Sequence, residues 1–295
     1  MSEPGTAAAP AEVVLLDRAP SLPRLYARAL RPRPHRPASL PSGQLELAAH
    51  ATDLDHLAAY SRVCGFRVSD RLPPTYPHVL AFPLQVQLMT GDDFPFGLAG
   101  MVHIRNVITQ HRPLDATDLL RIRVRAERLA PHDKGAQVDL VNEVYVDDEP
   151  VWVSRSTYLA RDAAAPPGAP EPSEEEPHPD PSGALPARWL VPRGLGRRSA
   201  AVSGDINPIH LHSLAARLFG FRGAIAHGMW TKAHCLAALG PRVPPAMTAD
   251  VSFRRPLPLG SSVRFLAAER PAGWDVAVVS SRRSSTHLSG SVRAS

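Results

Sequence analysis

The sequence predicts an α+β protein made of two copies of one unit, each a curved antiparallel sheet wrapped around a central helix. Each half contains an apolar helical segment, then the tripeptide Arg-Pro-Leu at 112–114 or 255–257, then strands in which apolar and polar residues alternate. A stretch without large apolar side chains separates the halves. The 295 residues, 44% of them hydrophobic, are enough for two modest cores.

We expect four regions along the chain. Residues 1–12 are predicted to be disordered, 13–161 to form a first domain, 162–184 a flexible linker and 185–295 a second domain. The linker consists of prolines, acidic residues and small residues, so it buries too little apolar surface to offset the entropy cost of ordering.

In the first half, Tyr76 to Met89 is predicted to be the central helix. The sheet is predicted from Leu120 onward, because Leu120, Ile122 and Val124 alternate with arginines. Apolar positions at 138–146 and 151–159 continue an antiparallel meander. We interpret the arginine row at 121–125 as the solvated face of a strand.

In the second half, Ala224 to Leu239 is the matching central helix, apolar nearly all round, as is typical of a helix enclosed by a sheet. Alternation at 263–267 and 274–278 predicts two strands of the second sheet.

A further helix is predicted from Asn207, a good N-cap residue, with Pro208 at the first helical position. Leucine and alanine recur at helical spacing behind it, and Gly220 is placed to end it. His210 then lies in the first turn and Asp205 just before the cap. Taken alone, this run is explained equally well by an ordinary capped helix start with a solvated histidine.

Two segments together resemble a known family. Residues 203–210 read Ser-Gly-Asp-Ile-Asn-Pro-Ile-His, and residues 223–230 read Gly-Ala-Ile-Ala-His-Gly-Met-Trp. They fill every position of the hydratase signature of the MaoC-like, (R)-specific enoyl-CoA hydratases, which have the hot-dog fold. Residues 72–83, Leu-Pro-Pro-Thr-Tyr-Pro-His-Val-Leu-Ala-Phe-Pro, resemble the N-terminal half of two-domain actinobacterial 3-hydroxyacyl-thioester dehydratases.

This resemblance implies a double hot-dog fold and a hydro-lyase that interconverts (3R)-3-hydroxyacyl and trans-2-enoyl thioesters. It assigns acid–base chemistry to Asp205 and His210, and stabilisation of an enolate oxygen to the backbone N–H of Gly228. A histidine near a helix N-terminus is expected to stay neutral. Substrate contacts or supporting roles are expected for Ser203, Asn207, His227, Arg254 and Arg255, with His227 more structural than basic.

The first half lacks the Gly-Asp-x-Asn-Pro-x-His run, so we expect one active site per chain. Thr52-Asp53-Leu54-Asp55-His56 offers acidic groups, but a capped helix start explains them better. By resemblance, the degenerate half has given up its catalytic residues and makes room for the acyl chain.

Other chemistries have no support in the sequence. There is no glycine-rich dinucleotide or phosphate loop, so no cofactor is expected. No metal is expected either, because His210 and His212 face different ways on a helix and Cys64 and Cys235 lack ligand spacing. The net charge of +5 comes almost wholly from arginine, and no nucleic-acid-binding motif accompanies it.

We expect a cytoplasmic protein that does not bind nucleic acid or a membrane, because neither a secretory signal nor a long apolar run occurs. The expected partner is an acyl thioester of coenzyme A or of acyl carrier protein, and leftover sheet edges are compatible with a homodimer. Two alternatives stay open: a hot-dog acyl thioesterase, and a non-catalytic subunit that binds acyl thioesters.

Overall fold

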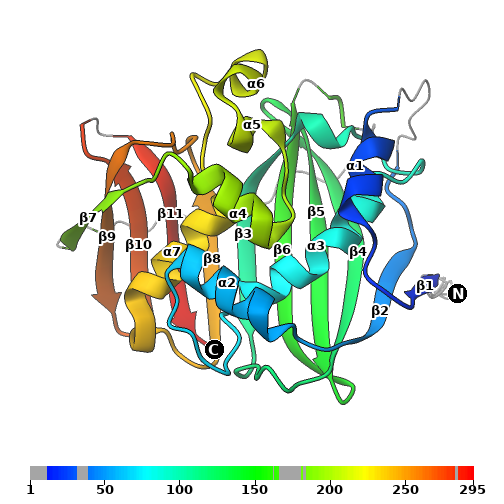
Figure 1. Cartoon of the computed structure of the whole chain (residues 1–295), viewed down its shortest axis with the longest axis horizontal. Helices are drawn as coiled ribbons and strands as arrows, with labels where there is room; N and C mark the ends of the chain where they lie inside the picture. The colour runs from blue at the N-terminus through cyan, green and yellow to red at the C-terminus, as the bar shows by residue number, and fades with distance from the viewer. Residues whose placement is uncertain (1–11, 32–38, 162, 166–180, 182–183, 283–284) are drawn as a thin grey trace, which may run out of the picture.

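The structure is a computed structural model that describes residues 12–31, 39–161, 163–165, 181, 184–282 and 285–295. The predictions for residues 1–12 and for the linker at 162–184 lie almost wholly outside the described residues. The rest of the chain forms one sheet with helices on one side of it (Figure 1).

Within the described residues, eleven strands form a single sheet in the order β1-β2-β4-β5-β6-β3-β8-β11-β10-β9-β7. The first half of the chain supplies β1 (Val13–Leu16), β2 (Gln44–His50), β3 (Met101–Gln110), β4 (Leu120–His132), β5 (Gly135–Val146) and β6 (Glu149–Arg161). The second supplies β7 (Leu185–Leu190), β8 (Met247–Phe253), β9 (Ser262–Arg270), β10 (Gly273–Ser280) and β11 (Thr286–Ala294). Antiparallel pairing of β3 with β8 joins the two half-sheets.

The helices of the first half are α1 (Leu22–Ala29), α2 (Leu54–Cys64) and α3 (Tyr76–Met89), followed by the 3₁₀ turn η1 (Leu98–Gly100). The second half has α4 (Leu195–Ser203), α5 (Pro208–Leu211), α6 (Ser213–Leu218), α7 (Gly228–Leu239) and the 3₁₀ turn η2 (Gly240–Arg242). Figure 1 shows α3 in front of the strands of the first half and α7 in front of those of the second. In the part of the chain that the structure describes, no helix is long and apolar enough to cross a membrane.

The two central helices were predicted with different success. The helix predicted from Tyr76 to Met89 is confirmed, and nearly all of its residues are buried. The helix predicted from Ala224 is wrong in its start, because α7 begins at Gly228. Residues 225 and 226 lie before the helix instead: Ile225 forms an isolated β-bridge with Pro258, and the Ala226 amide donates to the Leu257 carbonyl.

The prediction of a single helix from 207 to 220 is also wrong, because the structure has two short helices there. Its start is confirmed, since the Asn207 side chain accepts a hydrogen bond from the Ile209 amide and Pro208 is the first helical residue. His212 adopts an extended conformation and divides the segment into α5 and α6. Leu214 is 76% exposed and Leu218 is 88% exposed, so the leucine spacing has no opposing surface to pack on.

The arginine row of β4 is not simply solvated. Arg121 and Arg123 both form ion pairs with Glu46 on β2, and Arg125 pairs with Glu143 on β5. Each arginine side chain keeps only about a quarter of its surface exposed. The row therefore links three neighbouring strands across the outer face of the sheet.

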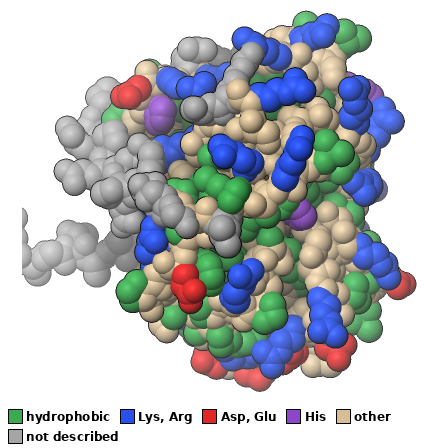
Figure 2. All heavy atoms as spheres, turned by 90° about the vertical axis from the view of Figure 1, so that its left-hand side faces the viewer, with side chains coloured by type: hydrophobic (Ala, Val, Ile, Leu, Met, Phe, Trp, Pro, Cys, Tyr) green, Lys and Arg blue, Asp and Glu red, His purple; other side chains and the backbone are tan. Residues whose placement is uncertain are grey.

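Basic side chains are also present at the other edge of the sheet. Figure 2 shows them spread over the face on the side of β7 and β9, among apolar and uncharged residues. Arg188 and Arg264 lie opposite each other in the β7–β9 pair, and Arg188 donates to the Ser262 hydroxyl. On this face the positive charge is distributed over several strands.

A buried lysine connects α7 to the junction of the half-sheets. Lys232 is fully buried, and its Nζ donates to the Asn106 side-chain oxygen at 2.5 Å, the Asn106 carbonyl at 3.0 Å and the Ala249 carbonyl at 2.9 Å. Burial lowers the pKa of Lys232 to about 7, against the opposing effect of Asp250. Because Asn106 lies on β3 and Ala249 on β8, this one side chain bonds to a strand from each half.

We predict that Lys232→Ala lowers the free energy of unfolding by at least about 2 kcal/mol, because it leaves a cavity and unpaired buried carbonyls. Lys134→Ala is the matched control, since the other lysine is exposed on the β4–β5 turn. It should change stability by less than about 0.5 kcal/mol. Urea unfolding followed by circular dichroism measures both, and equal stability of the two variants would contradict the assigned role of Lys232.

Candidate active site

A cavity of about 1270 Å³ lies between the two halves of the molecule. Its walls come from α1, α3, β3 and β6 of the first half and from the segments around Asp205, His227 and β8 of the second. The structure places every sequence-predicted site residue on this cavity: Ser203, Asp205, Asn207, His210, His227, Gly228, Arg254 and Arg255.

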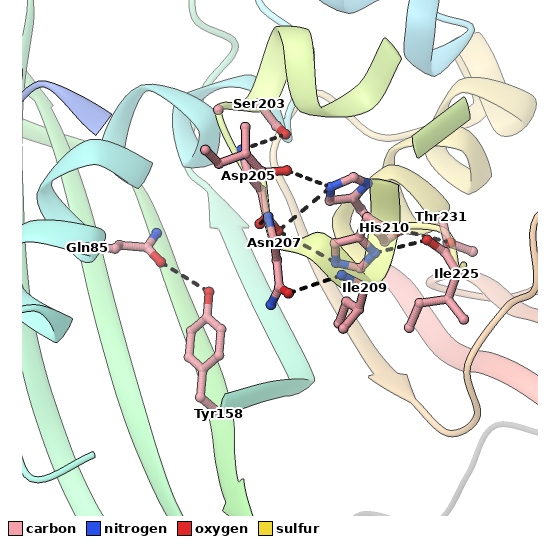
Figure 3. A network of polar contacts seen from close by, with 12 residues as sticks. Gln85, Tyr158, Ser203, Asp205, Asn207, Ile209, His210, Ile225 and Thr231 are labelled. Atoms are coloured by element: carbon pink, nitrogen blue, oxygen red, sulfur yellow. Dashed lines mark hydrogen bonds and ion pairs between the residues drawn. The ribbon is translucent and has the colours of Figure 1, made fainter. Parts of the chain in front are cut away.

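The loop after α4 orients Asp205. Gly204 ends α4 in the left-handed region, at φ +72°, and its amide donates to the Ala200 carbonyl. The Asp205 amide then donates to the Ser203 hydroxyl at 3.2 Å. One carboxylate oxygen of Asp205, Oδ1, accepts from the Asn207 amide at 3.1 Å. The other, Oδ2, faces two histidine rings (Figure 3).

His210 presents a basic nitrogen to Asp205. Its Nδ1 lies 2.9 Å from the Ile225 carbonyl, which can only accept, so Nδ1 carries the proton and Nε2 carries a lone pair. Nε2 is 3.8 Å from Asp205 Oδ2. Burial, followed by the neighbouring His227, lowers the pKa of His210 to about 4, although Asp205 and the Ile225 carbonyl act in the opposite direction. His210 is therefore neutral at pH 7.

His227 connects the start of α7 to the Asp205 loop. It occupies the N-cap position of α7, and its ring stacks on His210 with centroids 3.8 Å apart. Its Nε2 donates to the main-chain carbonyl of Asp205 at 2.9 Å. Through these two contacts, His227 holds the His210 ring and the Asp205 loop in position.

Gly228 is the first residue of α7, so its N–H is among the four amides that have no acceptor within the helix. A Cβ at this position would lie 3.1 Å from the Phe253 ring, so a side chain would press on that ring. Arg254 and Arg255 follow β8, and the main-chain amides of both bond to the His287 carbonyl. Arg255 is exposed, which puts positive charge at the edge of the cavity.

Asp205, His210 and His227 also come close enough to be considered as a metal site, with ligand atoms within 4.8 Å of one another. In the present arrangement, Nε2 of His227 is already used as a donor to Asp205. Only Asp205 Oδ2 and His210 Nε2 face the gap with free lone pairs, which fits proton transfer better than three-point metal coordination. Cys64 and Cys235 are free, buried thiols.

Tyr26 on α1 was missed in the sequence. Its hydroxyl donates to the Gly204 carbonyl and accepts from the Ile206 amide, both at 3.3 Å, so it holds the residues on either side of Asp205. Leu22 lies one helical turn before Tyr26 and packs against Gly204. A Cβ added to Gly204 would be only 2.2 Å from the Leu22 side chain. Burial raises the pKa of Tyr26, so the hydroxyl stays protonated. No local pattern could reveal a contact made across 178 residues.

In the first half, a buried side chain occupies the start of the central helix, where the second half has a glycine. That helix begins with Tyr76, which is fully buried, whereas the second begins with Gly228. The Tyr76 hydroxyl bonds to His56 Nδ1 at 2.8 Å. Asp53 caps α2 by accepting from the Asp55 and His56 amides, as predicted. Neither Asp53 nor Asp55 lines the cavity.

The chain was compared with known proteins. Residues 197–272 match the family model of the MaoC like domain. The 3-hydroxyacyl-thioester dehydratase X of Mycobacterium tuberculosis (strain ATCC 25618 / H37Rv) is 39% identical over 258 residues, which cover 88% of this chain and 91% of that protein. The crystal structure of HtdX from the same species superposes with a TM-score of 0.75 at 37% identity, covering 85% of this chain and 100% of that one.

A more distant M. tuberculosis protein, described as having a double hot-dog fold, superposes with a TM-score of 0.55 at 16% identity, over 84% of this chain and 94% of that one. That likeness concerns the fold alone. The similarity to the dehydratase, in contrast, extends over both halves, so this chain belongs to the MaoC-like dehydratase family, with a double hot-dog fold.

Proposed function

We propose that the protein is a hydro-lyase that removes water from (3R)-3-hydroxyacyl thioesters to give trans-2-enoyl thioesters, and that catalyses the reverse hydration. The observation that carries this proposal is the pairing of Asp205 Oδ2 with an unprotonated His210 Nε2, 3.8 Å apart on a large cavity. The strong similarity to a 3-hydroxyacyl-thioester dehydratase over most of the chain supports it.

The 3.8 Å gap suits one oxygen atom that hydrogen-bonds to both groups. In hydration, a water in this gap attacks C3 of the enoyl thioester while His210 Nε2 accepts one of its protons and Asp205 Oδ2 accepts the hydrogen bond of the other. The electron pair of the double bond moves toward the thioester oxygen. The proton taken from water then returns to C2 on the same face, and dehydration follows the same steps backwards.

The negative charge that develops on the thioester oxygen needs a donor. The Gly228 N–H is free of helical partners and lies at the positive end of α7. A positioned donor of this kind is worth roughly 10²–10³-fold in rate. Gly228 has no side chain to press on the Phe253 ring, which a Cβ would approach to 3.1 Å.

The two ends of the substrate fit different parts of the cavity. Arg254 and Arg255, at the edge, suit the phosphate of a phosphopantetheine group carried by coenzyme A or acyl carrier protein. The acyl chain would lie inside, between the halves. The volume of about 1270 Å³ exceeds the roughly 300–1,000 Å³ of common small-molecule pockets, which favours long or bulky acyl groups.

The function is tested by incubating the purified protein with trans-2-enoyl-CoA substrates of increasing length. We expect loss of the conjugated thioester absorbance without release of free thiol, measured in parallel with a thiol-reactive dye. Release of thiol would instead identify a thioesterase. Saturable binding without either change would identify a non-catalytic acyl-binding protein.

The acid–base pair can be tested by substitution. Asp205→Asn and His210→Ala should each lower kcat by at least about 10²-fold, the usual contribution of a positioned acid or base. Asp55→Asn in the first half is the matched control, and it should leave kcat nearly unchanged because Asp55 lies off the cavity. Wild-type turnover in both site variants, with unaltered melting temperatures, would rule the pair out.

The pH profile follows from the lowered pKa of His210. Because the base must be neutral and its pKa is about 4, kcat/KM should stay level as the pH falls from 8 to about 5, and should decline only below that. An unperturbed histidine would lose half its activity near pH 6.5. Initial rates at each pH, with circular dichroism to verify folding, distinguish the two profiles.

Tyr26 is predicted to position the loop without touching the substrate. Tyr26→Phe removes both hydrogen bonds that flank Asp205, and we expect kcat to fall by about tenfold with little change in KM. Tyr145→Phe is the matched control, since that hydroxyl donates to Glu143 and is not on the cavity wall. An equal effect of the two variants, or a change confined to KM, would contradict this role.

A further inference from the structure

A row of polar aromatic side chains lines the cavity wall supplied by the first half. His78 on α3 stacks toward His103 on β3 with ring centroids 6.0 Å apart, and His103 stacks on Tyr158 of β6 at 4.5 Å. The Tyr158 hydroxyl donates to the side-chain oxygen of Gln85 on α3 at 3.2 Å. His78, His103 and Tyr158 all line the cavity.

Among the residues that the structure describes, three polar atoms in or directly behind this row have no hydrogen-bond partner. They are His78 Nδ1, Gln85 Nε2 and His103 Nε2, and all three are buried. His78 is only 3% exposed and Gln85 is fully buried. Buried polar groups are normally paired, so three unpaired ones this close together are a feature that the fold does not explain.

The row is uncharged. Burial lowers the pKa of His78 to about 3 and that of His103 well below its usual value, with further lowering from the nearby Lys232. A neutral imidazole offers one donor and one acceptor, so these side chains suit an uncharged hydrogen-bonding group better than a phosphate or carboxylate.

The row lies opposite the acid–base pair. Figure 3 shows Gln85 and Tyr158 on the side of α3 and β6, with Asp205, Asn207 and His210 on the other side. The negative charge of Asp205 acts to raise the pKa of both His78 and Tyr158, although burial has the larger effect on each. His103 also meets the edge of Phe253 at 5.0 Å, and Phe253 packs against Gly228. A substrate held at Gly228 would therefore extend its acyl chain past this row.

We propose that His78, His103 and Tyr158, with Gln85 behind them, form a hydrogen-bonding subsite that selects acyl thioesters carrying an uncharged oxygen, such as a hydroxyl or keto group, further along the chain than C3. This proposal rests on the proposed function. A plain alkyl chain leaves the three polar atoms unpaired, whereas an oxygen beside His78 or His103 can pair with a ring nitrogen when that ring turns toward the cavity. The substrate oxygen would thus supply a hydrogen-bond partner that the described protein atoms do not.

The test uses a trans-2-enoyl-CoA of fixed length and a series in which a single hydroxyl is moved along the chain from C5. For one position we expect kcat/KM to exceed that of the unsubstituted chain by about fivefold or more, the value of one net hydrogen bond. Calorimetric binding of the matching saturated acyl-CoA pair should show the same preference without requiring turnover.

His103→Phe and Tyr158→Phe should each bring the ratio of kcat/KM for the hydroxylated chain to kcat/KM for the unsubstituted chain close to one. The unsubstituted substrate should be turned over as well as before or better. His103→Phe should change the melting temperature little, because it removes one unpartnered nitrogen together with one hydrogen bond to the Arg105 main chain. Tyr158→Phe removes only one oxygen and serves as the second variant if His103→Phe fails to fold. His132→Phe is the matched control, since His132 lines the cavity but already accepts from the Lys134 amide.

Equal kcat/KM and equal binding for every hydroxylated chain and the plain chain would overturn the subsite. So would a preference that persists in both variants. These outcomes differ from failure of the proposed function, in which the wild-type protein would not hydrate even the unsubstituted enoyl-CoA. In that case the binding preference alone decides the proposal.

Discussion

The antiparallel pairing of β3 with β8 is the constraint on which the site depends. It joins two half-sheets that the chain builds separately, and side chains reinforce it, with Arg105 bonded to Asp250 and Thr109 to Thr248 across the strand pair. Lys232 adds a buried link from α7 to both strands. Because this register places the two half-sheets side by side, groups from the first half reach a loop that belongs to the second.

The charges of the molecule are separated by depth. Arginines occupy the outer face of the sheet and the edge of the cavity, whereas the histidines inside are held neutral by burial. This distribution fits a substrate with a phosphorylated carrier group at one end and an uncharged acyl chain at the other. Burial disfavours the charged form of an imidazole, which is the main reason why the pKa of the histidine beside Asp205 is lowered to about 4.

The two halves share an architecture but have different roles. Where α7 begins with a glycine whose amide is free, α3 begins with a buried tyrosine bonded to His56. The first half keeps the fold and contributes walls: Tyr26 holds the Asp205 loop, and Tyr158 faces it across the cavity. In the second half, the cap at Asn207 and the turn at Gly204 place the carboxylate and the imidazole together.

Local patterns in the sequence determined the repeated helix-and-strand unit, the helix from Tyr76 to Met89, the cap at Asn207 and the motif that carries Asp205 and His210. These features depend on residues a few positions apart, where spacing and capping act directly. Only the tertiary structure decided that α7 starts at Gly228, that Leu214 and Leu218 stay exposed, and that Tyr26 and the His78–His103–Tyr158 row meet the cavity. The reason is that each of these depends on what packs opposite, and the opposite surface comes from a segment far away in the chain.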